Sequence, residues 1–230
     1  VLNKKVTMLL ADSHIHYLAT KEAMIEPFFS SSVSRLPNGD PCTSYGLSSY
    51  GYDIRLGRSF IFYKGEENKI IPIIRDDKIE NIYINSVEKT VINPNNFDPN
   101  LVVQINDVDR IFIPPKTYFM GVSLEYIRMP RNITAICNGK STIARSGLEI
   151  FVTPLEAGWS GYITLEFFNA TDSVMELTPG MGISQLCFLE GNTVCNTSYA
   201  DRDGKYQNQG PHPIPPLKKL NTPSSLKVIK

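Results

Sequence analysis

A chain of 230 residues, 42% hydrophobic and 20% charged, is long enough to bury a sizeable core, and one domain with decorations is its simplest organisation. Its 23 basic and 23 acidic residues give a formal net charge of zero, so no overall field would draw it to nucleic acid or to an anionic membrane. No apolar stretch approaches the length needed to span a bilayer. Any anionic ligand must therefore be met by local basic residues.

The cysteines and histidines bear on compartment and on metal binding. Four cysteines are scattered without a close pair, at Cys42, Cys137, Cys187 and Cys195. This spacing predicts reduced thiols in a cytoplasmic protein. His14 and His16, two apart, would point away from each other on a helix, and no zinc-deaminase motif follows them, so no zinc site is expected. Residues 1–7 precede the first methionine and are interpreted as a leader or an added segment.

The N-terminal quarter predicts one helix, a loop and a strand. A helix is expected from a cap at Asp12 or Ser13 through Met24, because Pro27 would end it. Residues 30–43, rich in Ser, Pro, Gly and Asn, predict a loop. Residues 45–56 predict a single strand whose glycines indicate close backbone approach or a bulge.

The remainder predicts an all-β fold. Residues 64–89 alternate charges of both signs among isoleucines, which indicates a surface hairpin with a solvated face. From residue 101 onward, short apolar segments are separated by proline and glycine turns, with almost no helical periodicity. This pattern is typical of a sandwich, jelly roll or distorted barrel. Residues 211–230, rich in Pro, Lys and Ser, are expected to be disordered.

Residues 139–145 combine the features that bind an anion. Gly139 lets the backbone approach a ligand closely. Ser141 and Thr142 supply hydroxyl donors, and Lys140 and Arg145 supply positive charge. The run is not a Walker A loop, because no glycine stands at the required spacing upstream, and such a run also occurs by chance. Phosphate contact is one interpretation of it.

Glu166 stands in an apolar, β-branched segment, residues 161–168, that predicts a buried strand. Alternation places Tyr162, Thr164, Glu166 and Phe168 on one face. A carboxylate in such a strand is costly to bury unless something uses it or pairs with it. Glu166 is therefore a candidate proton acceptor, and the other interpretation is a paired or edge-exposed carboxylate.

Four motifs follow one another along the chain: Gly139-Lys140-Ser141-Thr142-Ile143-Ala144-Arg145, Val152-Thr153-Pro154-Leu155-Glu156-Ala157-Gly158-Trp159, Thr164-Leu165-Glu166 and Tyr199-Ala200-Asp201-Arg202-Asp203-Gly204-Lys205-Tyr206-Gln207. Together they resemble the signature of the dCTP deaminase family. Segments 45–53 and 96–99 extend the similarity, which covers most of residues 8–210 in order. On this resemblance residues 8–210 form one dUTPase-like β domain with a short N-terminal helix and a mobile C-terminal tail.

The resemblance also implies an activity and its residues. The expected reaction converts dCTP and water to dUTP and ammonia, towards dUMP and dTTP synthesis, without zinc. Homotrimers would share active sites between subunits and bind Mg²⁺ through the nucleotide triphosphate. Glu166 would be general base and proton shuttle, with Ser141 and Arg145 positioning the water and the amine. The implied nucleotide contacts are Lys140, Ser141, Thr142, Ile143, Ala144, Arg145, Thr164, Leu165, Glu166, Gln185, Tyr199, Lys205 and Gln209, with Glu156 as a sugar contact.

Two other functions stay open beside this one. A bifunctional enzyme would deaminate dCTP and also hydrolyse the triphosphate, and the carboxylate of Glu156 keeps that reading available. A non-catalytic nucleotide-binding trimer would need Glu166 only for structure. Ser141, Arg145 and Glu166 occurring together at family spacing favour an enzyme over the non-catalytic trimer. The diphosphatase pattern has an aspartate in the turn where Glu156 stands and a glycine-rich tail where this chain has Lys205-Tyr206-Gln207, so the monofunctional deaminase is preferred. Two features depart from the family pattern: residues 64–90 form a charged insertion, and Lys140 stands where many relatives have arginine.

Overall fold

The computed structural model describes residues 8–88 and 91–216, so residues 1–7 and 217–230, interpreted above as a leader and as part of a disordered tail, lie outside the described part. Strands dominate the chain. In order, the elements are β1 (Met8–Leu9), α1 (Asp12–Lys21), β2 (Ile25–Glu26), β3 (Val33–Arg35), β4 (Pro41–Ser48), β5 (Gly51–Arg55), β6 (Phe60–Tyr63), β7 (Lys69–Arg75), β8 (Lys78–Ile84), the 3₁₀ helix η1 (Pro99–Leu101), β9 (Val102–Ile105), β10 (Arg110–Ile113), β11 (Tyr118–Arg128), β12 (Ile133–Gly139), α2 (Ser141–Arg145), β13 (Leu148–Phe151), β14 (Ser160–Asn169), β15 (Met175–Leu177) and β16 (Gly182–Glu190). Within the described part, no helix is long and apolar enough to cross a membrane.

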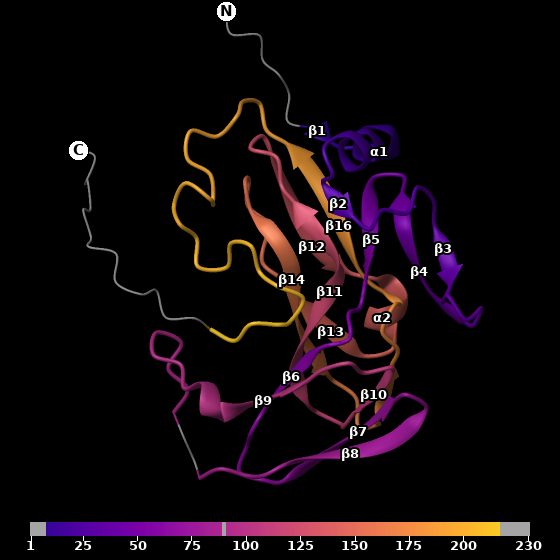
Figure 1. Cartoon of the computed structure of the whole chain (residues 1–230), viewed down its shortest axis with the longest axis vertical. Helices are drawn as coiled ribbons and strands as arrows, with labels where there is room; N and C mark the ends of the chain where they lie inside the picture. The colour runs from indigo at the N-terminus through magenta and orange to yellow at the C-terminus, as the bar shows by residue number, and fades with distance from the viewer. Residues whose placement is uncertain (1–7, 89–90, 217–230) are drawn as a thin grey trace, which may run out of the picture.

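The strands form three antiparallel sheets. One has the order β1-β16-β5-β4-β3, with β12 also paired to β16. The second has the order β13-β14-β11-β6-β9, with β2 paired to β11, and the third has the order β15-β10-β7-β8. In Figure 1 the long strands cross the middle of the molecule, with α1 near one end and the β7–β8 hairpin at the other. The prediction of an all-β fold is confirmed, and the arrangement is that of a jelly roll.

One apolar core joins the three sheets. Along β14 the side chains alternate between buried and half-buried, so Leu165 and Phe167 face the core while Glu166 faces away. Phe119 of β11 stacks on Phe167 and on Phe62 of β6, with ring centroids 4.9 and 5.6 Å apart. The alternation of residues 161–168 therefore assigned these side chains to the two faces of the strand correctly.

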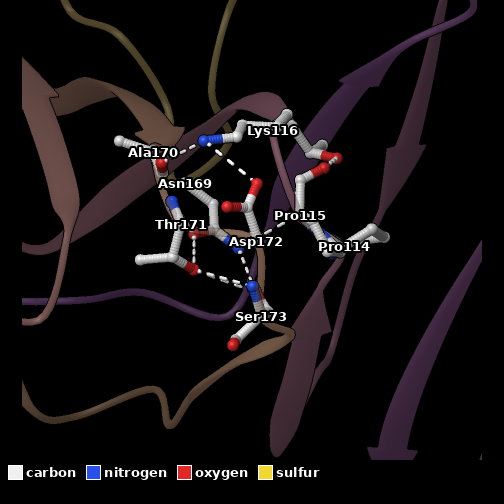
Figure 2. Close-up of polar contacts among 9 residues, drawn as sticks. Pro114, Pro115, Lys116, Asn169, Ala170, Thr171, Asp172 and Ser173 are labelled. Carbon is white, nitrogen blue, oxygen red and sulfur yellow. Dashed lines mark hydrogen bonds and ion pairs between the residues drawn. The ribbon is translucent and has the colours of Figure 1, made fainter.

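The end of β14 is fixed by a buried amide. The Asn169 side chain is fully buried, and its Nδ2 donates to the carbonyl oxygens of Pro114 and Ser173 at 3.0 and 2.9 Å. Its Oδ1 accepts from the backbone and the hydroxyl of Thr171. Figure 2 shows these contacts, with Lys116 closing the same turn through Ala170. Asn169 thus joins the end of β14 to the connection that leads into β11.

The N-terminal helix is shorter than predicted. It covers Asp12–Lys21, its cap position is Ala11 without a side-chain hydrogen bond, and neither Asp12 nor Ser13 caps it. Ala23 has a φ of 52°, which ends the helical path before Met24. Met24 is nevertheless fully buried, so it packs on the core from the segment that leads into β2.

The sequence prediction for residues 30–56 was wrong in two places. The expected loop at 30–43 contains β3 and the start of β4. The expected single strand at 45–56 is a hairpin, because Ser49 and Tyr50 turn the chain between β4 and β5. Both strands of that hairpin belong to the sheet that carries β16 and β12.

The charged segment 64–89 contains the predicted hairpin, formed by β7 and β8. It also does more than cover the surface, since β7 pairs with β10 and the side chains of Ile71 and Ile73 are fully buried. Its charges lie outside this buried stripe, as in the Arg75–Glu80 ion pair at 2.7 Å.

Candidate active site

Glu166 lies in the middle of β14 between apolar neighbours. Its register partners are Met120 on β11 and Phe151 on β13. The carboxyl is half-buried, and burial raises the pKa of Glu166 to about 7. A carboxyl with such a pKa can both accept and donate a proton near neutral pH.

Two cavities meet at Glu166. The larger, about 720 Å³, contains Glu166 and Thr164 of β14, and Tyr63 and Tyr118 from the neighbouring strands. The smaller, about 470 Å³, lies between Glu166 and Gly139 at the end of β12. Glu166 of β14 therefore lines both cavities, as do Val152 and Thr153.

Two tyrosines stand beside Glu166. The rings of Tyr63 and Tyr118 meet edge to face with centroids 5.6 Å apart. Burial, followed by the charge of Glu166, raises the pKa of Tyr118 to about 12 and also raises the pKa of Tyr63. Both hydroxyls stay protonated at neutral pH and can donate hydrogen bonds into the cavity.

The C-terminal segment runs along β14 and covers the cavity. Figure 1 shows it in yellow, passing β14 after the end of β16. Gln209 is buried, its carbonyl oxygen accepts from Tyr162 N at 3.0 Å, and its Nε2 donates to Thr164 Oγ1 at 2.6 Å. Trp159 Nε1 donates to the carbonyl oxygen of Tyr206 at 2.9 Å. This segment reaches beyond residue 210, because Ile214 N also donates to Thr164 Oγ1, at 3.2 Å.

Glu156 lines the rim of the larger cavity. Its carboxylate forms an ion pair with Arg202 of the C-terminal segment, and both side chains are about half exposed. The side chain of Arg202 also lies over the ring of Tyr199, 5.9 Å from the centroid. Glu156 is thus tied to the segment that covers the cavity.

A second polar cluster is built on the other sheet. The carboxylate of Asp53 on β5 pairs with Lys140 Nζ, and its Oδ1 accepts from Gln185 Nε2 at 3.0 Å. Lys140 Nζ also reaches Ser44 Oγ at 3.4 Å. The side chains of Asp53 and Lys140 are 9% and 13% exposed, so this ion pair is largely removed from solvent.

The residues after Lys140 form a single helical turn, α2, that the sequence did not predict. Ile143 is buried and anchors this turn, which packs against β13. The side chains of Ser141, Thr142 and Arg145 are exposed on its surface. Among residues 8–88 and 91–216, no group of three or more His, Cys, Asp or Glu side chains is placed to hold a metal ion.

Comparison with known proteins decides the family. The model of the dCTP deaminase-like domain matches residues 99–191. The dCTP deaminase of Leptothrix cholodnii is 42% identical over 199 residues, which is 86% of this chain and 94% of the relative. The dCTP deaminase of Acinetobacter baumannii is 38% identical over the same shares. The chain belongs to the dCTP deaminase family.

A solved structure supports the fold of this dCTP deaminase family member. The 2′-deoxycytidine 5′-triphosphate deaminase from Agrobacterium tumefaciens superposes with a TM-score of 0.51 over 81% of this chain and 49% of that chain. The two are 17% identical, so the likeness concerns the fold alone.

The structure divides the residues predicted from the dCTP deaminase motifs into two groups. One group lines the larger cavity and consists of Glu156, Thr164, Glu166, Tyr199, Lys205 and Gln209. The other group lines neither cavity at Glu166; it consists of Lys140, Ser141, Thr142, Ile143, Ala144, Arg145 and Gln185. Ile143 and Leu165 are buried, so neither side chain faces a ligand and only their main-chain groups could contact one.

Sequence reasoning missed several residues at this site. Tyr63, Tyr118 and Met120 line the cavity from β6 and β11, and Trp159 holds the covering segment. Alternation along residues 117–124 could have placed Tyr118 and Met120 on one face, but not opposite Glu166. That pairing depends on the register between β11 and β14, which joins distant parts of the chain.

Proposed function

We propose that the chain catalyses the hydrolytic deamination of dCTP to dUTP and ammonia, with Glu166 as general base and proton shuttle. The observation that carries this proposal is the half-buried Glu166, with a pKa of about 7, in a cavity that also holds Thr164, Tyr199, Lys205 and Gln209. Membership of the dCTP deaminase family supports the same reaction.

The proton inventory of this reaction fits a single carboxyl. As water adds to C4 of the cytosine, the Glu166 carboxylate accepts a proton from the water and delivers it to N3. The tetrahedral adduct then breaks its bond from C4 to the amino nitrogen, which leaves as ammonia once it has gained a proton through Glu166. The C4 hydroxyl loses its proton as the uracil carbonyl forms. A pKa near neutrality lets Glu166 act in both directions.

The phosphates would contact basic side chains from the group of residues that lines the larger cavity and from the group that includes α2. Lys205 lines the cavity from the covering segment, and Lys140 lies at the start of α2. Mg²⁺ would be held by the triphosphate oxygens and would offset their charge.

A homotrimer with shared active sites accounts for the division of the site. Ser141 and Arg145 are exposed on α2 and do not line the Glu166 cavities of their own chain. In a shared site, α2 of one subunit would complete the cavity of its neighbour. A cytoplasmic location fits the free state of all four cysteines.

The ion pair of Glu156 favours deamination alone. A diphosphatase needs a carboxylate that is available to activate water, and Glu156 is paired with Arg202. The monofunctional reaction is therefore preferred to the bifunctional one.

A product assay tests the proposal. The protein is incubated with dCTP and MgCl₂, and nucleotides, ammonia and pyrophosphate are measured beside a Glu166→Gln control. We expect dUTP and ammonia in equal amounts without pyrophosphate, and neither product from the control. Appearance of dUMP with pyrophosphate would instead establish the bifunctional enzyme, and binding of dCTP without turnover would establish a non-catalytic nucleotide-binding protein.

A further inference from the structure

Asp53 occupies the centre of a row that crosses one sheet. Its register partners are Gly46 on β4 and Gln185 on β16, and Gln185 in turn pairs with Asn138 on β12. Directly opposite residues share one face of a sheet, so Asp53 and Gln185 point the same way. Gly46 adds no side chain to this row, which leaves the carboxylate to Gln185 and to whatever comes from beyond the end of β12.

Lys140 comes from beyond that end. It follows Gly139, the last residue of β12, and reaches back to the Asp53 carboxylate and to Ser44 Oγ. A lysine ammonium has three donors, and these two partners in the described part of the chain use two of them. The third donor remains for an oxygen of a ligand. A flexible four-carbon side chain is thereby held in one place beside α2.

Gln185 is oriented by the same carboxylate. An ionised carboxylate only accepts hydrogen bonds, so the amide must turn its Nε2 toward Asp53 Oδ1, at 3.0 Å. The same Nε2 lies 3.3 Å from Ser48 Oγ. The Oε1 of Gln185 therefore points away from Asp53; it accepts a weak hydrogen bond from Cys187 Sγ at 3.9 Å and keeps a second lone pair for a ligand. It suits a hydroxyl or amino group of a ligand and not a phosphate oxygen.

We propose that Asp53 is a positioning residue for the nucleotide: it fixes the ammonium of Lys140 for a phosphate and the amide of Gln185 for a sugar hydroxyl. This inference rests on the proposed function, in which both partners contact dCTP. Each carboxylate oxygen of Asp53 serves one of these two partners. A buried ion pair adds little to stability compared with well-packed apolar residues, so positioning explains the retention of charge here better than stability does.

The test compares Asp53→Asn with a matched control, Glu80→Gln, which removes one charge from the Arg75–Glu80 pair on the β7–β8 hairpin. The dissociation constant for dCTP with MgCl₂ is measured by titration calorimetry, and KM and kcat by ammonia release. We expect Asp53→Asn to weaken dCTP binding and raise KM by about 10- to 100-fold, with kcat changed less than about threefold, since the contacts are remote from C4. Glu80→Gln should match the wild type.

A second background separates positioning from folding. Asp53→Asn is also introduced into a Lys140→Gln chain. There, the fold-loss of dCTP affinity caused by Asp53→Asn should be at least about fivefold smaller than the fold-loss it causes in the wild type, because Asp53 acts largely through Lys140. The inference would be overturned if the Asp53→Asn variant bound dCTP as tightly as the wild type. It would also be overturned if the fold-losses of affinity caused by Asp53→Asn and by Lys140→Gln multiplied independently in the double variant, or if both Asp53→Asn chains lost cooperative unfolding. Wild-type binding of dCTP without turnover would overturn the proposed function while leaving the binding test of Asp53 intact.

Discussion

Glu166 is held where its charged form is disfavoured, and this sets the pH dependence of the reaction. Burial raises its pKa to about 7, so below that pH most of the carboxyl is protonated and cannot accept a proton from water. We expect kcat/KM to fall about tenfold for each pH unit below about 7. Glu166→Gln should lower kcat/KM by about a thousandfold at pH 8, and its difference from the wild type should narrow below pH 7, where the wild type also lacks an ionised base. Ammonia release between pH 5 and 9 measures both effects, and a flat profile below pH 7 would contradict the assignment of the base.

The same burial predicts a stability cost. In the unfolded chain Glu166 ionises at its ordinary pKa of 4.5, whereas the folded protein keeps the proton until about pH 7. The contribution of Glu166 to the free energy of unfolding is therefore most favourable below the unfolded pKa and is lost as the pH rises through the folded pKa. We expect Glu166→Gln to raise the free energy of unfolding by about 2 kcal/mol at pH 8 and to have little effect at pH 4.

Urea denaturation at the two pH values checks this cost. Glu149→Gln is the matched control, because Glu149 lies on β13 opposite Phe168, on the same face as Glu166, but is exposed. The control should change stability equally at both pH values. If Glu166→Gln behaved like the control, burial of the charge would not be the cause of the raised pKa.

Among the elements, β14 depends on the amide that ends it. Asn169 is fully buried and makes hydrogen bonds with both its amide nitrogen and its oxygen. Asn169→Ala leaves these backbone groups without a partner, and we expect it to cost about 3 kcal/mol of unfolding free energy. Asp172→Asn in the same turn should cost less than about 0.5 kcal/mol, since that side chain is 91% exposed. Equal urea midpoints for the two variants would show that the buried network does not hold the strand.

The elements also show which parts of the fold could be read from the sequence. The two faces of β14 followed from alternation, because that pattern is local and one face is buried. The β4–β5 hairpin did not, since the turn at Ser49 and Tyr50 lacks the Asn-Gly or Asp-Gly signature of a tight turn. The end of α1 was missed because Ala23, which is not a glycine, adopts a positive φ.

Contacts between distant segments were the least predictable part of the site. The family resemblance named Glu166, Lys140 and Gln185 in advance as site residues, but it assigned no role to Asp53, which lies 87 residues before Lys140. Its partners are set by the register of β5 against β16 and by the path of the chain after β12. Burial of the carboxylate is a consequence of that packing and leaves no local pattern.

At the scale of the whole molecule, the division of the site makes a prediction about assembly. If α2 of one subunit completes the Glu166 cavity of another, a defect in each half can be repaired by mixing. Arg145→Ala and Glu166→Gln subunits are each expected to be inactive when pure. In mixed homotrimers a site is intact only when an Arg145→Ala subunit supplies its Glu166 and a Glu166→Gln subunit supplies its Arg145. Random mixing at equal concentrations should therefore restore about a quarter of the wild-type activity.

The mixing experiment needs subunits that exchange. The two variants are unfolded together in urea, refolded at equal concentrations and assayed for ammonia release, beside each variant refolded alone. Light scattering reports whether the assemblies have the mass of trimers. A pair of variants in the same half, Arg145→Ala with Ser141→Ala, is the matched control and should stay inactive, because no mixture of them contains an intact α2. Recovery of activity in the first mixture alone would establish the shared site, and trimers that stay inactive in both mixtures would place the complete site within one chain.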